Sequence, residues 1–179
     1  MATTPVFRTW VAGEVVTAAY FNANVRDAGN FFLSVPTLEA RQTVAQSIAN
    51  SATSALSMDT EDFDNDNMHS TVTNSSRATP VTAARYQVSG ATSYVSNATG
   101  SRHAEIWKNG AALNGGGASM QTDSAGVSTR QPTRTLTLPM NGTTDYVEIV
   151  AFQTSGVGLN TDVTGITQPT LSVRWVGTT

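Results

Sequence analysis

Two histidines are the side chains of this sequence best suited to acid–base chemistry. His69 and His103 lie 34 positions apart, and serines and aspartates are plentiful around both. A Ser-His-Asp hydrolase could in principle be built from these residue types. However, no serine sits in a G-x-S-x-G turn, and the sequence has no H-E-x-x-H. The sequence therefore predicts no catalytic site, and we expect the histidines to be surface or partly buried imidazoles.

An acidic run between residues 59 and 66 has the alternation of a calcium-binding loop. Asp62, Asp64 and Asp66 occupy every second position, as the first ligands of such a loop do. The rest of the pattern fails, because Asn67 stands where glycine is needed and Thr73 where the bidentate glutamate is needed. We interpret the run as a solvated acidic loop, with calcium binding as the alternative, and expect no other cofactor.

Aromatic side chains on strand-like runs are the remaining candidates for binding. Tyr94 and Trp107 could stack on a sugar ring, but aromatic residues on a two-faced strand more often belong to a core or an interface. The strands carry more rings than one inner core needs. The candidates for trimer or surface contacts are Tyr86, Tyr94, Trp107, Tyr146, Phe152 and Trp175.

Short β-like runs separated by turn signals dominate the chain from about residue 53 onward. The clearest runs cover residues 85–96, 102–108, 128–138, 145–154 and 170–176. Asn109-Gly110 is the strongest hairpin signal, since both residues accept a positive φ. Strands at this density without intervening helices predict a mainly β, antiparallel jelly-roll sandwich over residues 53–179.

One convincing helix precedes this region. Thr17 is suited to cap its N-terminus. Phe21, Val25, Ala28 and Phe32 then recur at spacings of 4, 3 and 4, which gives one apolar stripe. Pro36 prevents continuation. We therefore divide the chain into a short extended and helical anchor (1–36), a linker (37–52) and the head (53–179).

The anchor holds many aromatic residues for its length. A segment of about 35 residues cannot bury them by itself. They pack either on the chain's own head or on another protein, and we favour the second alternative. In that interpretation, Arg26 and Asp27 would pair at the polar rim of the contact.

Composition excludes several classes of protein. Charged residues make up only 13%, the formal net charge is −3, and nine of the ten basic residues are scattered arginines. Nucleic-acid binding, which needs clustered cations, is not expected. The chain has no cysteine, no apolar run long enough to span a membrane, and no signal peptide at its start. We therefore expect no membrane insertion, and synthesis in a host cytoplasm.

An ordered series of motifs in the second part of the chain resembles one known type of head. The head resembles that of complement components and of tumour-necrosis-factor-type cytokines, with arginine and threonine replacing two glycines of the pattern. That resemblance implies a jelly-roll fold and a homotrimer. The matching motifs are Phe63-Asp64, Tyr86-x-Val88, Asn109-Gly110, Leu136-x-Leu138, Asp145 to Gln153 and Leu171 to Val176.

The first 36 residues are similar to openings of tail and other virion proteins of phages of actinobacteria. The matching residues are Trp10, Gly13-Glu14, Thr17-Ala18, Asn22 and Val25-Arg26-Asp27. Such openings precede various distal domains, which implies an attachment module. We take the anchoring residues to be Trp10, Glu14, Phe21, Asn22, Val25, Arg26, Asp27 and Phe32.

Together these features predict a non-enzymatic structural protein of a bacteriophage virion, displayed as a trimer and aiding attachment to the host surface. A tail location of the minor-tail or fibre type is favoured, and a capsid decoration or head fibre is the alternative. Its partners would be its own copies, other virion proteins and host surface glycans. A free carbohydrate-binding module or a polysaccharide hydrolase are the other classes left open. The hydrolase would require paired carboxylates in a cleft.

Overall fold

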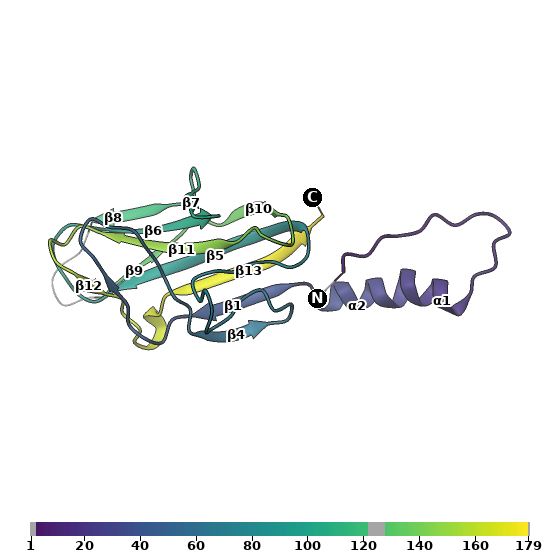
Figure 1. Ribbon diagram of the computed structural model, residues 1–179, viewed down its shortest axis with the longest axis horizontal. Helices are drawn as coiled ribbons and strands as arrows, with labels where there is room; N and C mark the ends of the chain where they lie inside the picture. Colours follow the sequence, from purple (N-terminus) through teal and green to yellow (C-terminus); the bar gives the residue numbers. More distant parts are fainter. Residues whose placement is uncertain (1–2, 122–127, 179) are drawn as a thin grey trace.

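The computed structural model describes residues 3–121 and 128–178, with the side chains of residues 120 and 121 left out. It shows a β-sandwich head from which an N-terminal helix and an extended limb project at one end (Figure 1). This confirms the predicted mainly β, antiparallel jelly roll with a short helical N-terminus.

The helix begins where the sequence predicts. Thr17 caps α1 (Ala18–Phe21) by accepting from the Tyr20 backbone N–H at 3.3 Å. A π-helical turn, η1 (Asn22–Arg26), continues directly into α2 (Asp27–Leu33). Elsewhere among the described residues the only helical element is the 3₁₀ turn η2 (Gly165–Thr167), so the helix is confined to the N-terminal part as expected.

Two sheets pack face to face to form the head. The first follows the order β10 (Leu136–Met140), β5 (Ala84–Tyr94), β13 (Thr170–Gly177), β1 (Thr37–Arg41) and β4 (Thr60–Asp64), with β9 (Thr129–Pro132) also on β5. The second follows the order β3 (Ser54–Ala55), β11 (Val147–Gln153), β6 (Ser101–Lys108) and β7 (Ala111–Ala112), with β8 (Ala118–Gln121) also on β6. A small pair joins β12 (Leu159–Asn160) to β2 (Ser47–Ile48).

The predicted linker is wrong for its first residues. Residues 37–41 form β1, which pairs with β13 on one side and with β4 on the other. Leu38 and Ala40 point into the core and are buried, while Glu39 is exposed on the outer face. The alternation is present in the sequence, but it spans only five residues, two of them charged, which is too short to distinguish a strand from a connector. The head therefore begins at Thr37, and three residues separate it from the end of the helix.

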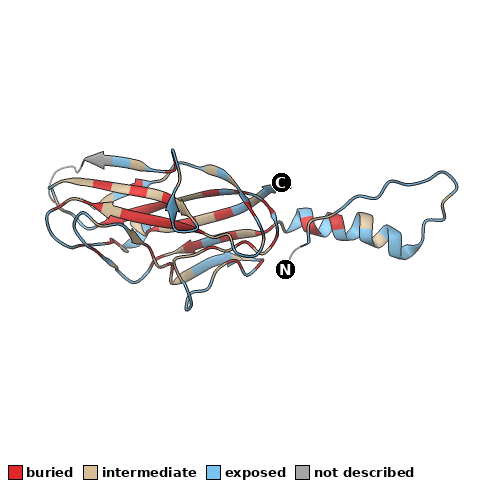
Figure 2. Cartoon of the chain, turned by 45° about the horizontal axis from the view of Figure 1, so that its top comes forward, coloured by how far each residue is buried: buried red, intermediate tan, exposed pale blue. Residues whose placement is uncertain are grey.

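The core lies between the two sheets, where inward positions alternate with outward ones. On β6, Arg102, Ala104 and Ile106 are buried while their neighbours are only partly covered. Figure 2 shows the buried residues concentrated in the strands of the head, whereas the projecting segment is largely exposed. Asn109-Gly110 forms the predicted turn after β6, with φ of 53° and 76°.

Candidate functional site

The limb (residues 3–16) and the helix fold into one N-terminal unit. Gly13 and Glu14, which belong to the motif found in the sequence, lie in the turn that connects the two parts. The Glu14 backbone N–H donates to Val11 O at 3.0 Å, and the Glu14 carboxylate accepts from the Val11 N–H at 3.3 Å. Glu14 also forms an ion pair with Arg8. Because Gly13 lies in the turn at φ 81°, the chain reverses here and runs into the cap at Thr17. Glu14 thus shapes the segment.

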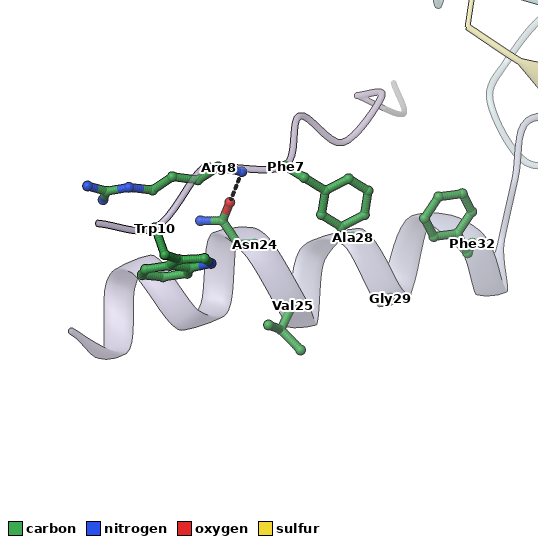
Figure 3. Close-up of a pocket in the computed structure, with 8 residues that line it drawn as sticks. All are labelled: Phe7, Arg8, Trp10, Asn24, Val25, Ala28, Gly29 and Phe32. Atoms are coloured by element: carbon green, nitrogen blue, oxygen red, sulfur yellow. Dashed lines mark hydrogen bonds between the residues drawn. The ribbon is translucent and has the colours of Figure 1, made fainter. Parts of the chain in front are cut away.

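Arg8 holds the limb against the helix. Its backbone N–H donates to Asn24 Oδ1 at 2.9 Å (Figure 3), and Asn24 Nδ2 donates to Tyr20 O at 2.9 Å. Its guanidinium lies 4.3 Å from the ring centroid of Tyr20 and 5.4 Å from that of Trp10. Sequence reasoning missed Arg8 and Asn24, because their contact depends on the limb folding back across 16 residues.

Limb and helix together enclose an open apolar pocket of about 390 Å³. From the helix, Asn24, Val25, Ala28, Gly29 and Phe32 line it, the last three at spacings of 3, 4 and 7 from Val25. Phe7, Arg8 and Trp10 line it from the limb, as Figure 3 shows. Ala28 is covered, but about half of Val25 and of Phe32 remains exposed. The structure therefore brings Trp10, Val25 and Phe32 of the predicted anchor to one place.

The other predicted anchor residues lie outside this pocket. Phe21 is 53% exposed, and Asn22 starts the π-helical turn. Arg26 and Asp27 form an exposed ion pair with each other, with Arg26 Nε donating to Asp27 Oδ1 at 2.8 Å. Of the helix, Phe31 reaches the head, where it packs edge to face on Trp175 with ring centroids 5.0 Å apart.

Two of the six aromatic contact candidates are wrong. Tyr86 and Tyr94 point into the core and have no exposed surface. The Tyr86 hydroxyl donates to Thr82 O at 3.0 Å, and the Tyr94 hydroxyl lies 2.6 Å from His103 O and 3.0 Å from Phe152 O. The phase of β5 turns both rings inward, so neither can touch another molecule.

The remaining four rings are partly exposed. Trp107 and Phe152 point outward from β6 and β11, opposite to the inward Ile106 and Ala151. The Trp107 indole N–H donates to Glu105 at 2.7 Å, and Phe152 packs edge to face on His103. Tyr146 lies beneath the Arg77 guanidinium at 4.1 Å, and Trp175 closes the head beside the helix.

The three aspartates of the acidic run make separate contacts within the chain. Asp62 forms an ion pair with Arg41, while Asp64 accepts from the backbone N–H groups of residues 66, 68 and 69. Asp66 is buried and accepts from the Thr82 hydroxyl at 3.3 Å. Across residues 3–121 and 128–178, no three His, Cys, Asp or Glu side chains gather as a metal site would require. The three alternating aspartates therefore make contacts that hold this part of the head together.

The two histidines occupy separate places. The His69 side chain is fully buried between Glu61, 2.8 Å away, and the carbonyl of Ser75 at 2.9 Å. His103 Nε2 lies 3.0 Å from the Ser101 hydroxyl and 3.2 Å from that of Ser119. In the described part of the chain, no carboxylate is recorded on the other ring nitrogen of His103, so the orienting third member of a hydrolytic triad is not seen.

Of the comparisons with known proteins, the one with solved structures supports this fold. No family model matches the chain, and no curated protein matches its sequence. Among solved structures, the chain is similar to Eiger TNF from S. frugiperda, with a TM-score of 0.52 and 8% identity, over 80% of this chain and 96% of that one. The head is a tumour-necrosis-factor-like jelly roll. At this identity the likeness shows the fold alone. Within the described residues, no helix is both long and apolar enough to cross a membrane.

Proposed function

We propose that the chain is a non-enzymatic structural protein of a bacteriophage particle, associated with the tail. Three copies display their jelly-roll heads together and aid attachment to the host surface. The N-terminal segment (residues 3–34) docks the protein on the particle. A multivalent display lets weak contacts with host glycans add up to stable attachment.

The uncovered apolar surface of the N-terminal segment carries this proposal. Residues 3–34 hold eleven of the eighteen large hydrophobic side chains that are exposed among the described residues. Val6 is 87% exposed and Val15 is 78% exposed. An apolar surface of this density on a segment that extends away from its own head indicates a protein partner. The similarity of the same segment to the openings of phage tail proteins supports a virion protein as the partner.

The head suits display rather than chemistry. Its outer surface combines few charges with partly exposed aromatic rings at Trp107, Tyr146 and Phe152. Such a surface can meet neighbouring copies or glycans while leaving few ions unpaired. The tumour-necrosis-factor-like fold is typical of homotrimers, and we propose a homotrimer here.

Purified particles provide the test. We expect mass spectrometry to find the chain in washed particles, and gold-labelled antibody to mark the tail. Labelling of the capsid surface would instead favour a capsid decoration or head fibre. Replacing Val11 and Val15 by serine removes apolar area from the limb, and we expect it to reduce incorporation at least tenfold. Val72→Ser is the matched control, because Val72 is 88% exposed on the head.

Three results would contradict the proposal. They are particles that lack the wild-type chain, normal incorporation of the Val11→Ser, Val15→Ser variant, or an equal loss with Val72→Ser. A purified chain that binds host glycans but never joins a particle would identify a free carbohydrate-binding module.

A further inference from the structure

The pocket of the N-terminal unit has the residue spacing of a helix-packing site. Val25, Ala28, Gly29 and Phe32 stand at positions i, i+3, i+4 and i+7, which is the set of four residues that forms a hole for a side chain of a facing helix. Gly29 leaves this hole open, since a Cβ added there would meet nothing within 4 Å. What fits such a hole is a side chain projecting from another helix.

The same helix also carries the side chains that could enter such a hole. Val25 and Phe32 of the 4-3-4 stripe line the hole, and each is about half exposed, while Phe21 lies beyond the π-helical turn and outside the pocket. A 4-3-4 spacing is the spacing by which identical helices pack side by side. The helix is therefore complementary to itself, because it offers a hole and exposed apolar side chains on the same surface.

Charge does not oppose such a contact between copies. Within the helix from Ala18 to Leu33, the charged residues are Arg26 and Asp27, and these neutralise each other within one chain. Arg8, which lines the pocket from the limb, is paired with Glu14 of the same chain. Asn22, Asn24 and Gly29, which flank the stripe, are uncharged. Identical copies can therefore approach without like-charge repulsion.

The head fixes the direction in which each helix projects. Only residues 34–36 separate α2 from β1, and Phe31 and Phe32 both contact Trp175, with ring centroids 5.0 Å and 6.2 Å away. Heads that assemble around an axis running along the helix would bring their helices together in parallel. The helical contact would continue the interface between the heads.

The area available explains why the two contacts depend on each other. Aromatic side chains bury about 150–250 Å² each, so covering the exposed halves of Phe7, Trp10 and Phe32 at the pocket gives on the order of 300 Å² per copy. A standard interface needs about 800 Å² per partner. The helix alone falls short of this area, so a stable helical contact requires the heads to associate as well.

We propose that the helices of the assembled protein pack against one another in parallel, with the pocket at Gly29 occupied by an apolar side chain of a second copy. The inference deepens the proposed function, since it rests on the trimer and assigns the helix to copy–copy contact. The outward valines of the limb remain available for the particle.

The absence of cysteine from the chain makes a direct test possible. Val25→Cys places a thiol on the stripe, and Asn30→Cys places one on an exposed position outside the pocket. A disulfide requires Cα atoms within about 7 Å. In the purified full-length protein, we expect oxidation to link Val25→Cys chains to each other at least tenfold more efficiently than Asn30→Cys chains.

A second pair of variants tests the pocket itself in the Val25→Cys background. Gly29→Glu places like charges in the proposed contact, and we expect it to reduce crosslinking at least tenfold. Asn30→Glu adds the same charge one residue away and leaves crosslinking unchanged. Glutamate favours helix more than glycine does, so Gly29→Glu does not weaken the helix itself.

The outcomes separate this inference from the proposed function. A trimeric chain in which Val25→Cys links no better than Asn30→Cys overturns the inference and leaves the virion assignment standing. Crosslinks from Val25→Cys to a different particle protein also overturn it. Crosslinked copies of a chain that is absent from particles support the helical contact and defeat the virion assignment.

Discussion

The ring of Phe31 meets the ring of Trp175 edge to face, with centroids 5.0 Å apart and planes at 85°. This contact joins the projecting helix to the last strand of the head. It explains why Phe31 is buried at 7% exposure while Phe21, ten positions earlier, is 53% exposed.

Replacing Phe31 by alanine should therefore release the helix from the head. A fully enclosed phenylalanine costs about 3–5 kcal/mol when truncated, and at this open end we expect about 1–3 kcal/mol. Hydrogen exchange should accelerate for the amides of α2, while those of β5 and β11 change little. Phe21→Ala is the control, and equal effects of the two substitutions would show that Phe31 does not fasten the helix.

Asp162 should make the head sensitive to acid. Burial raises the pKa of Asp162, but hydrogen bonds from Ser128, Thr164 and Thr167 outweigh burial and hold the pKa at about 2. The ionised form is thus favoured in the folded state. Ionised Asp162 contributes about 2 kcal/mol to the free energy of unfolding for a pKa shift of this size. This contribution is present above pH 4 and is lost as the pH falls through about 2.

Asp162→Asn should consequently lower the free energy of unfolding by about 2 kcal/mol at pH 7, with a much smaller difference at pH 2. Urea unfolding at the two pH values measures this. Asp62→Asn removes a carboxylate from an exposed ion pair with Arg41, and we expect at most about 0.5 kcal/mol there. An Asp162→Asn effect that does not depend on pH would refute the explanation.

Local rules of the sequence predicted several elements of this fold. Thr17 caps the helix, Asn109-Gly110 makes the turn after β6, and the run predicted over residues 102–108 forms β6. Each of these depends on residues close together in the chain, which is why the sequence alone shows them.

Features that depend on distant partners could not be predicted in the same way. β1 pairs with β13, and Thr37 faces Arg174 across a separation of more than 130 positions. The inward direction of Tyr86 and Tyr94 depends on the register of β5, where a shift of one residue exchanges the two faces. The hydrogen bond from the Arg8 backbone N–H to Asn24 Oδ1 forms only when the limb folds back along the helix.

Tyr94 should limit stability in alkali. Burial raises the pKa of the Tyr94 hydroxyl above its ordinary value. The folded state therefore keeps the neutral form, while the unfolded chain ionises near pH 10. The contribution of Tyr94 to the free energy of unfolding is complete below pH 10 and is lost as the pH rises further.

Tyr94→Phe leaves the carbonyls of His103 and Phe152 without this donor and should cost about 1–2 kcal/mol at pH 7. The loss of stability above pH 10 should become shallower, because one group that ionises on unfolding is gone. Guanidinium unfolding between pH 7 and pH 11 measures both effects. Tyr20→Phe, which alters a partly exposed ring on the helix, should change neither, and a Tyr94→Phe variant with the wild-type alkaline slope would contradict the argument.

Gly100 lies in a tight connection before β6 that the buried Arg102 holds in place. The Arg102 guanidinium donates to the carbonyls of Asn97, Thr99 and Ser101 at 3.0, 3.1 and 2.9 Å. Gly100 has φ 77°, and a Cβ added to it would lie 1.9 Å from Thr154 O. An alanine here must therefore push two backbone segments apart.

Gly156 serves as a control that distinguishes the backbone strain of an alanine substitution from the steric clash of its Cβ. It has φ 86°, close to that of Gly100, but a Cβ added to it would meet nothing within 4 Å. Gly156→Ala should thus cost only the backbone strain of about 1–2 kcal/mol. Gly100→Ala should add the displacement of Thr154 and of the Arg102 contacts, for a total of about 3 kcal/mol or more. Thermal unfolding of the two variants side by side measures the difference, and equal costs would mean that the contact between Gly100 and Thr154 does not constrain the head.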